Sequence, residues 1–300
     1  YLRFEKNIGL PALTLARAYL KSRGKYLAFC FDDCELTKDH LKIHNNILKE
    51  EPDVMMTYSN SIMHIHNGSN ILGKKYCYDE LKKNNYISNS AVILKKEVVE
   101  DIGWYDPHVI LKRVCDWDYW IRIGKVYKIK HINRVTTEEH GTKLENSLGN
   151  SNSLNKDIVK KYMVLHRNKL LLPSVLADAS FNPFFIDRDY FSPSEMEDIF
   201  YLCLEHVSKT SSIEDLMKIT GDWLAHTVGI ENSSFVRKNS SFDMQNYRNN
   251  VLSNAFLFQF EFLQKKNAEL NTELVTLRDL CEERLKLIYK CQDLCEERLK

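Results

Sequence analysis

A short apolar run that ends in two acidic residues is the most prominent feature of the hydrophobic pattern. Residues 26–31 are all apolar or aromatic, and Asp32 and Asp33 follow them directly. An unbroken apolar run of this length between polar residues is typical of a strand buried on both faces. Ligands of open α/β sheets bind beyond the carboxyl ends of the strands, so we expect the two carboxylates at the mouth of a cleft.

The pattern on both sides of this strand predicts an α/β fold. Apolar residues at helical spacing predict a helix that ends at Gly24 and further helices at 39–50, 95–102 and 115–122. Short apolar or alternating runs predict strands at 53–58, 91–94 and 126–132, and residues 61–66 continue the first of these as a hairpin around Asn67-Gly68. Residues 136–149 are polar and predict a mobile flap. Helices alternating with short strands are typical of a mixed sheet flanked by helices.

The composition changes near residue 150, after which helical patterns dominate. Ser192 and Glu195 form a capping box, and residues 230–250 are a linker candidate rich in Asn and Ser. Residues 256–300 contain no Gly or Pro, and LCEERLK occurs at 280–286 and again at 294–300, two heptads later. We therefore expect a first domain at 1–150, a helical extension and linker at 151–250, and a long helix at 251–300. This last helix is expected to form a coiled coil and to self-associate through 256–300, with a lone exposed helix as the alternative.

The overall composition excludes several classes of function. The chain has 300 residues, of which 44% are hydrophobic, and a net charge of +1, so no bulk field attracts nucleic acid or anionic membrane. No apolar run is long enough to span a bilayer. The eight cysteines form no C-x-x-C pair, which favours a reducing, cytoplasmic setting. The chain begins without Met and stops inside a repeat, so it is expected to be a piece of a longer protein.

Several motifs together resemble one enzyme family. Residues 7 to about 148 resemble the family 2 glycosyltransferases, which have the GT-A fold. The motifs that carry the resemblance are Asn7-x-Gly9, Gly24 to Phe29, Asp32-Asp33 with Asp39-His40-Leu41, Gly103-Trp104-Tyr105-Asp106, Asp116 to Arg122, and His140 with Gly141 and Ser147. Their order and spacing are more specific than any one of them.

The resemblance implies a role for each of these residues. Asp116 corresponds to the catalytic base, Asp33 to a ligand of a divalent metal, and Asp32 to a residue near the nucleotide ribose. His140 corresponds to a histidine near the metal and the diphosphate, and Asn7 and Gly9 to residues close to the nucleotide. The implied reaction moves a sugar from a nucleoside diphosphate sugar, by default a UDP-sugar, to a hydroxyl acceptor such as a growing glycan, with inversion. The cofactor is Mg²⁺ or Mn²⁺.

The proposed chemistry agrees with the residue types. A divalent ion neutralises a leaving diphosphate, and a separate carboxylate removes the proton of the acceptor hydroxyl. Trp104, Trp117 and Trp120 could provide an apolar face for a sugar ring. Asp118 is expected to pair with Arg122 four residues later.

The sequence also departs from the family. Phe31 stands where many members carry a further Asp, and Arg17 lies later than the usual Arg in the first helix. The given residues do not include the first nucleotide-binding strand of the family. We expect this strand upstream of residue 1.

Other interpretations remain open at this stage. Asp32 and Asp33 could end a strand and cap a helix, Asp116 could cap its own helix, and Trp117 and Trp120 could belong to the core. His140 could be an exposed loop residue, and His64 and His66 are interpreted as a solvated strand edge. The chain could also be a degenerate transferase domain kept as a binding module, or a phosphoryl-transfer enzyme or hydrolase. The last class usually needs a P-loop, and the sequence contains none.

Overall fold

The structure is a computed structural model that describes most of the first two thirds of the chain. The described residues are 2–4, 8–141, 155–166, 170–176, 183–184, 190–210, 268, 270–279, 282–283 and 286. The chain divides into two compact units, Tyr1–Ser211 and Ser212–Lys300. The domain limits expected near residues 150 and 250 stay predictions.

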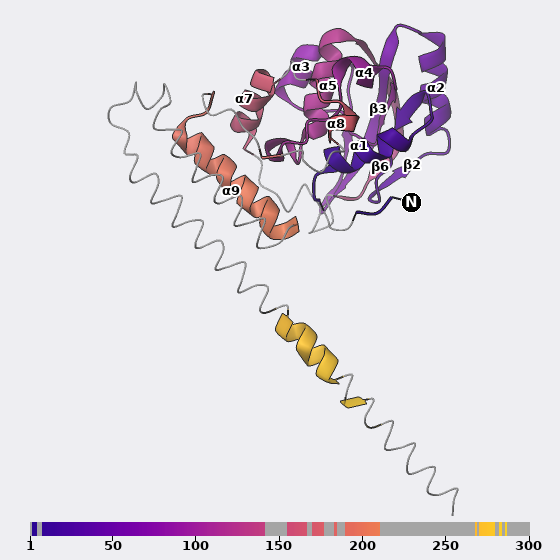
Figure 1. Cartoon of the computed structure of the whole chain (residues 1–300). Helices are drawn as coiled ribbons and strands as arrows, with labels where there is room; N and C mark the ends of the chain where they lie inside the picture. The colour runs from indigo at the N-terminus through magenta and orange to yellow at the C-terminus, as the bar shows by residue number, and fades with distance from the viewer. Residues whose placement is uncertain are drawn as a thin grey trace, which may run out of the picture. The chain divides into compact units, whose positions relative to one another are not determined.

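The first unit is an α/β structure in which helices lie on both sides of a mixed sheet (Figure 1). Its strands are β1 (Tyr26–Ala28), β2 (Cys34–Leu36), β3 (Val54–Ile65), β4 (Gly68–Leu72), β5 (Val92–Lys95) and β6 (Lys128–Glu139). Its helices are α1 (Pro11–Lys21), α2 (His40–Glu50), α3 (Tyr78–Lys83), α4 (Val98–Ile102), the 3₁₀ helix η1 (Val109–Leu111), α5 (Cys115–Val126), α7 (Lys156–His166), α8 (Pro173–Leu176) and α9 (Pro193–Thr210). The sequence-based α/β assignment is confirmed.

The sheet is built around β3. The strand order is β1-β5-β3-β6-β2, and β4 pairs with β3 outside this path. β3 and β6 run parallel, and every other pair is antiparallel. Val54, Met56 and Tyr58 of β3 are fully buried, as expected for a central strand.

The strand before the two acids differs from its prediction. β1 is only three residues long and forms the edge of the sheet, so it is not buried on both faces. Its pairing with β5 ends at Ala28, which is exposed. Phe29 is buried beyond the strand, where its ring packs edge-on against Trp120 at a centroid distance of 6.4 Å. The apolar run therefore reflects side-chain packing as well as strand pairing.

β6 also differs from its prediction. The strand continues to Glu139, so residues 136–139 are not part of a flap, and Thr136 and Thr137 are buried. The rest of the predicted flap, 142–149, lies outside the described residues. Strand pairing provides the reason, because β6 lies between β3 and β2 and its main chain bonds on both sides.

α5 is held in the core by an ion pair within the helix. The Arg122 Nε donates to Asp118 Oδ2 at 2.8 Å, and both side chains are 5% exposed. The guanidinium also donates to the carbonyl oxygens of Ile102 and Trp104, at 2.9 and 2.7 Å. The predicted i,i+4 pair is confirmed, and it fixes the turn between α4 and η1 onto α5.

α2 packs against β3 and β6 through two buried histidines. The His44 Nδ1 lies 2.8 Å from Thr57 Oγ1, and the His40 Nδ1 lies 2.7 Å from Thr136 Oγ1. Their ring centroids are 4.5 Å apart. Burial, with a smaller effect of His40, lowers the pKa of His44 to about 3. A neutral His44 is therefore part of the folded state.

This buried histidine predicts that the contribution of His44 to stability becomes unfavourable in acid. The unfolded chain takes up a proton at His44 near pH 6.5, whereas the folded chain does so only near pH 3, so stability falls as the pH falls between these values. Between pH 7 and pH 4 the free energy of unfolding should drop by about 3 kcal/mol from this group alone, at 1.36 kcal/mol per pH unit. Urea unfolding of the wild type and of His44→Asn at a series of pH values measures the drop as the difference between the two proteins.

The matched variants for this measurement are His44→Asn and His66→Asn. Asn can still hydrogen-bond to Thr57 but does not titrate, so His44→Asn should remove most of that pH dependence. His66 is exposed, and its replacement should leave the pH dependence unchanged. Equal pH dependence in wild type and His44→Asn would show that His44 does not carry the effect.

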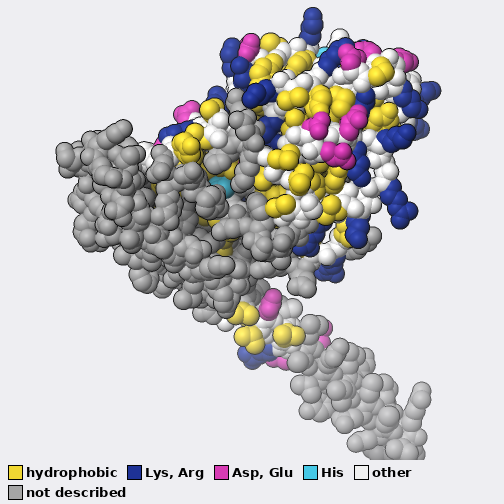
Figure 2. All heavy atoms as spheres, turned by 45° about the horizontal axis from the view of Figure 1, so that its top comes forward, with side chains coloured by type: hydrophobic (Ala, Val, Ile, Leu, Met, Phe, Trp, Pro, Cys, Tyr) yellow, Lys and Arg dark blue, Asp and Glu magenta, His cyan; other side chains and the backbone are white. Residues whose placement is uncertain are grey.

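Positive and negative side chains are mixed on the described part of the surface that Figure 2 shows. On the face shown in Figure 2, lysines and arginines are scattered, and acidic side chains lie among hydrophobic ones between them. This distribution agrees with a net charge of +1. Among the described residues, no helix is both long and apolar enough to cross a membrane.

In the second unit, the residues from 270 to 279 are helical. Leu270, Leu274 and Leu277 of the predicted seam are exposed there, at 56%, 63% and 59%. Leu263 lies outside the described residues, and the coiled coil stays a prediction.

Candidate active site

The two tandem acids lie in the turn that joins β1 to β2. The Asp33 carbonyl accepts a hydrogen bond from the His140 N–H at 2.8 Å. The Asp33 carboxylate lies so close to Gly141 that a Cβ at position 141 would overlap it. α2 begins only at His40, so the acids do not cap that helix, and the alternative interpretation is wrong.

Asp116 lies in the first turn of α5, as predicted. Its Oδ1 accepts from the Trp117 N–H at 2.8 Å, and its Oδ2 accepts from the Asn85 Nδ2 at 3.2 Å. Burial raises the pKa of Asp116 to about 6, and these two hydrogen bonds partly oppose the shift. The negative charge of Glu139 raises this pKa further. Asp116 is thus a carboxylate with a pKa close to neutral, which suits a general base.

Glu139, at the end of β6, connects the two groups of acids. Its Oε1 accepts hydrogen bonds from three serine hydroxyls, those of Ser61 at 3.2 Å, Ser90 at 2.7 Å and Ser88. Burial raises the pKa of Glu139, the Ser90 and Ser61 hydrogen bonds lower it, and the charge of Asp33 adds to the increase. Cys34, next to Asp33, pairs with Glu139 in the sheet, and the loop at 84–90 contacts both Glu139 and Asp116, so these contacts bring the three acids to one region of the molecule.

Sequence analysis missed Glu139 because it assigned residues 136–149 to a flap. One signal was available, since Val135, Thr136 and Thr137 are a run of β-branched residues that favours a strand. The loop at 84–90 also contributes to the site. It supplies Asn85 to Asp116 and Ser88 to Glu139.

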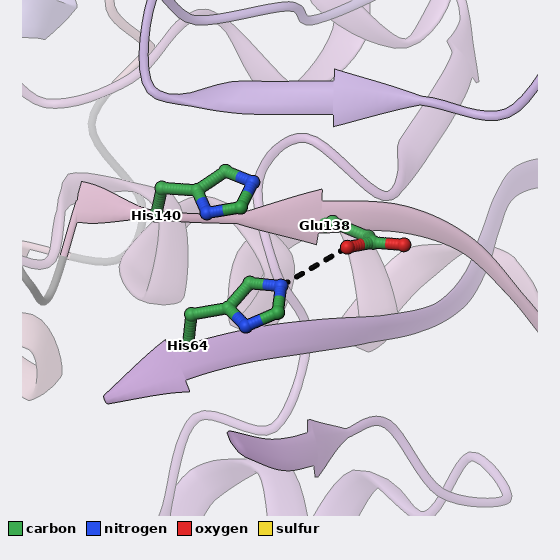
Figure 3. Close-up of side chains that lie close together, drawn as sticks. All are labelled: His64, Glu138 and His140. Atoms are coloured by element: carbon green, nitrogen blue, oxygen red, sulfur yellow. Dashed lines mark hydrogen bonds and ion pairs between the residues drawn. The ribbon is translucent and has the colours of Figure 1, made fainter. Parts of the chain in front are cut away.

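His140 lies in a second cluster, with His64 and Glu138 (Figure 3). Its ring stacks on that of His64, with centroids 4.5 Å apart and an angle of 5° between the planes. The His64 Nε2 lies 3.0 Å from Glu138 Oε2. His64 is therefore not part of a solvated edge, whereas His66 is exposed as expected. Among the described residues, Asp33 is not one of the three that form this cluster. The pairing of His140 with Asp33 on a metal stays a prediction.

Gly9 packs against α9. Its φ of 63° lies in the left-handed region that favours glycine, and a side chain there would overlap that of Thr210. These two constraints account for a glycine at this position. Its predicted role near a nucleotide stays a prediction, and Asn7 lies outside the described residues.

The three tryptophans do not form a surface for a sugar ring. Trp104, Trp117 and Trp120 are 1%, 3% and 0% exposed. The Trp104 and Trp117 indole N–H groups donate to the carbonyl oxygens of Ala12 and Leu81, at 3.1 and 2.6 Å. The expectation of a sugar platform is wrong, because these side chains are part of the packing of α5 against its neighbours.

A hollow of about 340 Å³ lies at the other end of β1 from the acids. It is lined by Lys25, Tyr26, Lys95, Lys96 and Glu97. The Lys95 and Lys96 ammonium groups already donate to main-chain carbonyl oxygens, at 2.5 and 2.8 Å. This hollow is separate from the acidic site.

No protein-family model and no curated protein matches the chain. Inferences about function therefore depend on the geometry of Asp33, Glu139 and Asp116. Two of these three carboxylates were predicted from the sequence.

Proposed function

We propose that the first unit is an inverting glycosyltransferase of the GT-A type, which moves a sugar from a nucleoside diphosphate sugar to a hydroxyl acceptor. The observation that carries the proposal is that segments far apart in the sequence meet around Glu139. Cys34, next to Asp33, pairs with Glu139, and the loop at 84–90 contacts both Glu139 and Asp116. The donor class is supported only by the resemblance of the motifs, with a UDP-sugar as the first candidate.

The electrostatics of the site fit a divalent cation at Asp33. Three carboxylates lie in one region. In addition to burial, the charge of Glu139 raises the pKa of Asp116, and the charge of Asp33 raises the pKa of Glu139. A positive charge beside Asp33 would offset that repulsion. Carboxylate oxygens are the ligands preferred by Mg²⁺. When bound, the cation would neutralise charge on the leaving diphosphate.

Residues of the chain carry out the proton transfer and position the groups that take part in it. Asp116 accepts the proton of the acceptor hydroxyl, and Asn85 orients its carboxylate through the 3.2 Å hydrogen bond. Glu139 is a positioning residue, because its serine contacts tie β3 and the loop at 84–90 to the end of β6. A single displacement with one base inverts the anomeric centre.

A donor screen tests this proposal. The full-length protein is incubated with individual UDP-, GDP- and dTDP-sugars in the presence of Mg²⁺ or Mn²⁺. Release of the nucleoside diphosphate is then measured. We expect release from one donor class, dependent on the metal and abolished by EDTA. Metal-independent release, or release that persists in Asp33→Ala at the wild-type rate, would contradict the proposal.

A binding module is the second candidate, and the exposed leucines of the second unit favour it. Leu270, Leu274 and Leu277 lie on one short helical stretch and are more than half exposed. A second copy of this chain could cover them through the predicted coiled coil. Donor binding without release of nucleoside diphosphate, in a protein that sediments as an oligomer, would favour this candidate over the enzyme.

A further inference from the structure

The pairing of three strands gathers two histidines and two glutamates at one place. In β3 and β6, Ile62 pairs with Glu138 and Met63 with Glu139, so continuing the register by one residue places His140 opposite His64. Paired residues in neighbouring strands point to the same face, and residues two apart in a strand share that face. On the other side of β6, Glu35 of β2 pairs directly with Glu138.

The distances agree with this register. The potential ligand atoms of His64, Glu138 and His140 all lie within 4.8 Å of one another (Figure 3). The His140 Nε2 is buried and makes no hydrogen bond among the described residues, although Glu35 Oε1 lies 3.5 Å away. A buried nitrogen without a hydrogen bond is costly, and coordination to a cation would satisfy it.

The donor set selects the kind of cation. Two imidazoles and one carboxylate suit Zn²⁺ and related transition metals, whereas Mg²⁺ prefers oxygen ligands alone. Zinc sites with three protein ligands leave a fourth position for water or another ligand. The Glu35 carboxylate is 77% exposed and lies next to that position.

The geometry points to a transition-metal site formed by His64, Glu138 and His140, with Glu35 at its open side and Zn²⁺ as the cation that it fits best. The parallel rings must turn about their Cβ–Cγ bonds so that both nitrogen lone pairs meet at one ion. The side chains of His64 and His140 are partly exposed, at 23% and 39%, which leaves room for this movement.

This site shares His140 with the metal site that the resemblance implies, but it includes none of the residues Asp33, Asp116 and Glu139 of the proposed transferase site. Glu139 contacts the serines of the acidic site, and its neighbours Glu138 and His140 alternate to the opposite side of the strand. The two sites still touch through the main chain, since the His140 N–H donates to the Asp33 carbonyl. A bound ion would join β3 to β6 beside the turn that carries Asp33.

Metal titration of the tag-free full chain tests the site. Zn²⁺ binding is measured by calorimetry, and Co²⁺ binding by visible absorption. We expect one Zn²⁺ per chain, a higher melting temperature with the ion, and a Co²⁺ spectrum without a thiolate charge-transfer band. His64→Ala, Glu138→Gln and His140→Ala should each weaken Zn²⁺ binding by about 100-fold or more, because loss of even an outer partner of a metal ligand costs 10–100-fold.

Two control variants separate this site from its neighbours. His66→Ala removes an exposed histidine two residues from His64, and Asp33→Ala removes the acid of the proposed transferase site. Both should bind Zn²⁺ as tightly as the wild type. Melting curves in EDTA confirm that each variant folds, which we expect because the replaced side chains are only partly buried.

Several results would overturn the inference. These are an absence of Zn²⁺ binding by the wild type, full binding by folded His64→Ala, loss of binding in Asp33→Ala, or a thiolate band in the Co²⁺ spectrum. The last would show that a cysteine binds the ion, and Cys30 and Cys34, whose sulfur atoms are 4.0 Å apart, would be the first residues to replace. None of these results depends on whether the chain releases a nucleoside diphosphate, so the two proposals fail separately.

Discussion

Asp116→Asn should lower turnover with the donor and acceptor by about 10²–10⁴-fold, the usual contribution of a general base. Asn keeps the size of the side chain but cannot take the proton of the acceptor hydroxyl. Donor binding should change little, since Asp116 is expected to contact the acceptor. Steady-state kinetics, with donor affinity measured separately by calorimetry, check both parts of this expectation.

Asp79→Asn is the matched control for this prediction. Asp79 also lies in the first turn of a helix, α3, but its side chain is 77% exposed. Its replacement should leave turnover unchanged. Wild-type turnover in Asp116→Asn would show that the base has been assigned to the wrong residue.

The pH dependence of the rate follows from the same carboxylate. With the pKa of Asp116 raised to about 6, the base becomes protonated as the pH falls through that value, and the rate should fall with it. The folded chain binds this proton more tightly than the unfolded chain, so ionised Asp116 lowers stability above pH 6, and the cost disappears as the pH falls toward 4. Glu139→Gln removes a neighbouring negative charge and should shift the acid limb of the rate profile to lower pH.

Asp118→Ala should destabilise the protein by about 3–5 kcal/mol, because it leaves the buried Arg122 guanidinium without its counter-charge. The guanidinium would keep its hydrogen bonds to the carbonyl oxygens of Ile102 and Trp104 and its contact with the Tyr119 ring, but these contacts carry no opposite charge. Urea or thermal unfolding of the purified variant measures the loss. A loss of this size exceeds a third of the stability of many domains, so low soluble yield is a further expected result.

Asp79→Ala provides the comparison at the surface. Asp79 pairs with Lys82 at 2.7 Å, but both side chains are substantially exposed, so the loss should be within about 1 kcal/mol. A destabilisation below 1 kcal/mol in Asp118→Ala would mean that water reaches Arg122 and that the pair does not hold α5 in the core.

Sequence patterns predicted best those elements whose signals are local. α2 and α5 begin at or within one residue of their predicted starts, and β5 lies within one residue of the strand expected at 91–94. The hairpin of β3 and β4 forms as predicted, but its turn is His66-Asn67, one residue before the expected Asn67-Gly68, because Gly68 already pairs with Ile65. The Asp118–Arg122 pair was predictable because residues four apart meet on one helix face.

Predictions failed where a distant strand decides the outcome. Residues 136–139 are polar enough to resemble a loop, yet they lie between β3 and β2 and bond to both. The three tryptophans were compatible with a sugar platform until the packing of α5 buried them. His64 was predicted to be solvated because nothing near it in the sequence indicates a partner. The register of β3 with β6 brings it to Glu138 and His140.

By itself, the amino-acid sequence determined the order of most helices and strands of the first unit, although not β2 or α3, together with the i,i+4 pair of α5 and the positions of Asp33 and Asp116 near the ends of predicted elements. Only the tertiary structure decided that Glu139 lies between these two acids and that two histidines and a glutamate meet on β3 and β6. The physical reason is that periodicity, capping and turn preference act over a few residues, whereas these clusters depend on the register of strands whose residues are more than 70 positions apart.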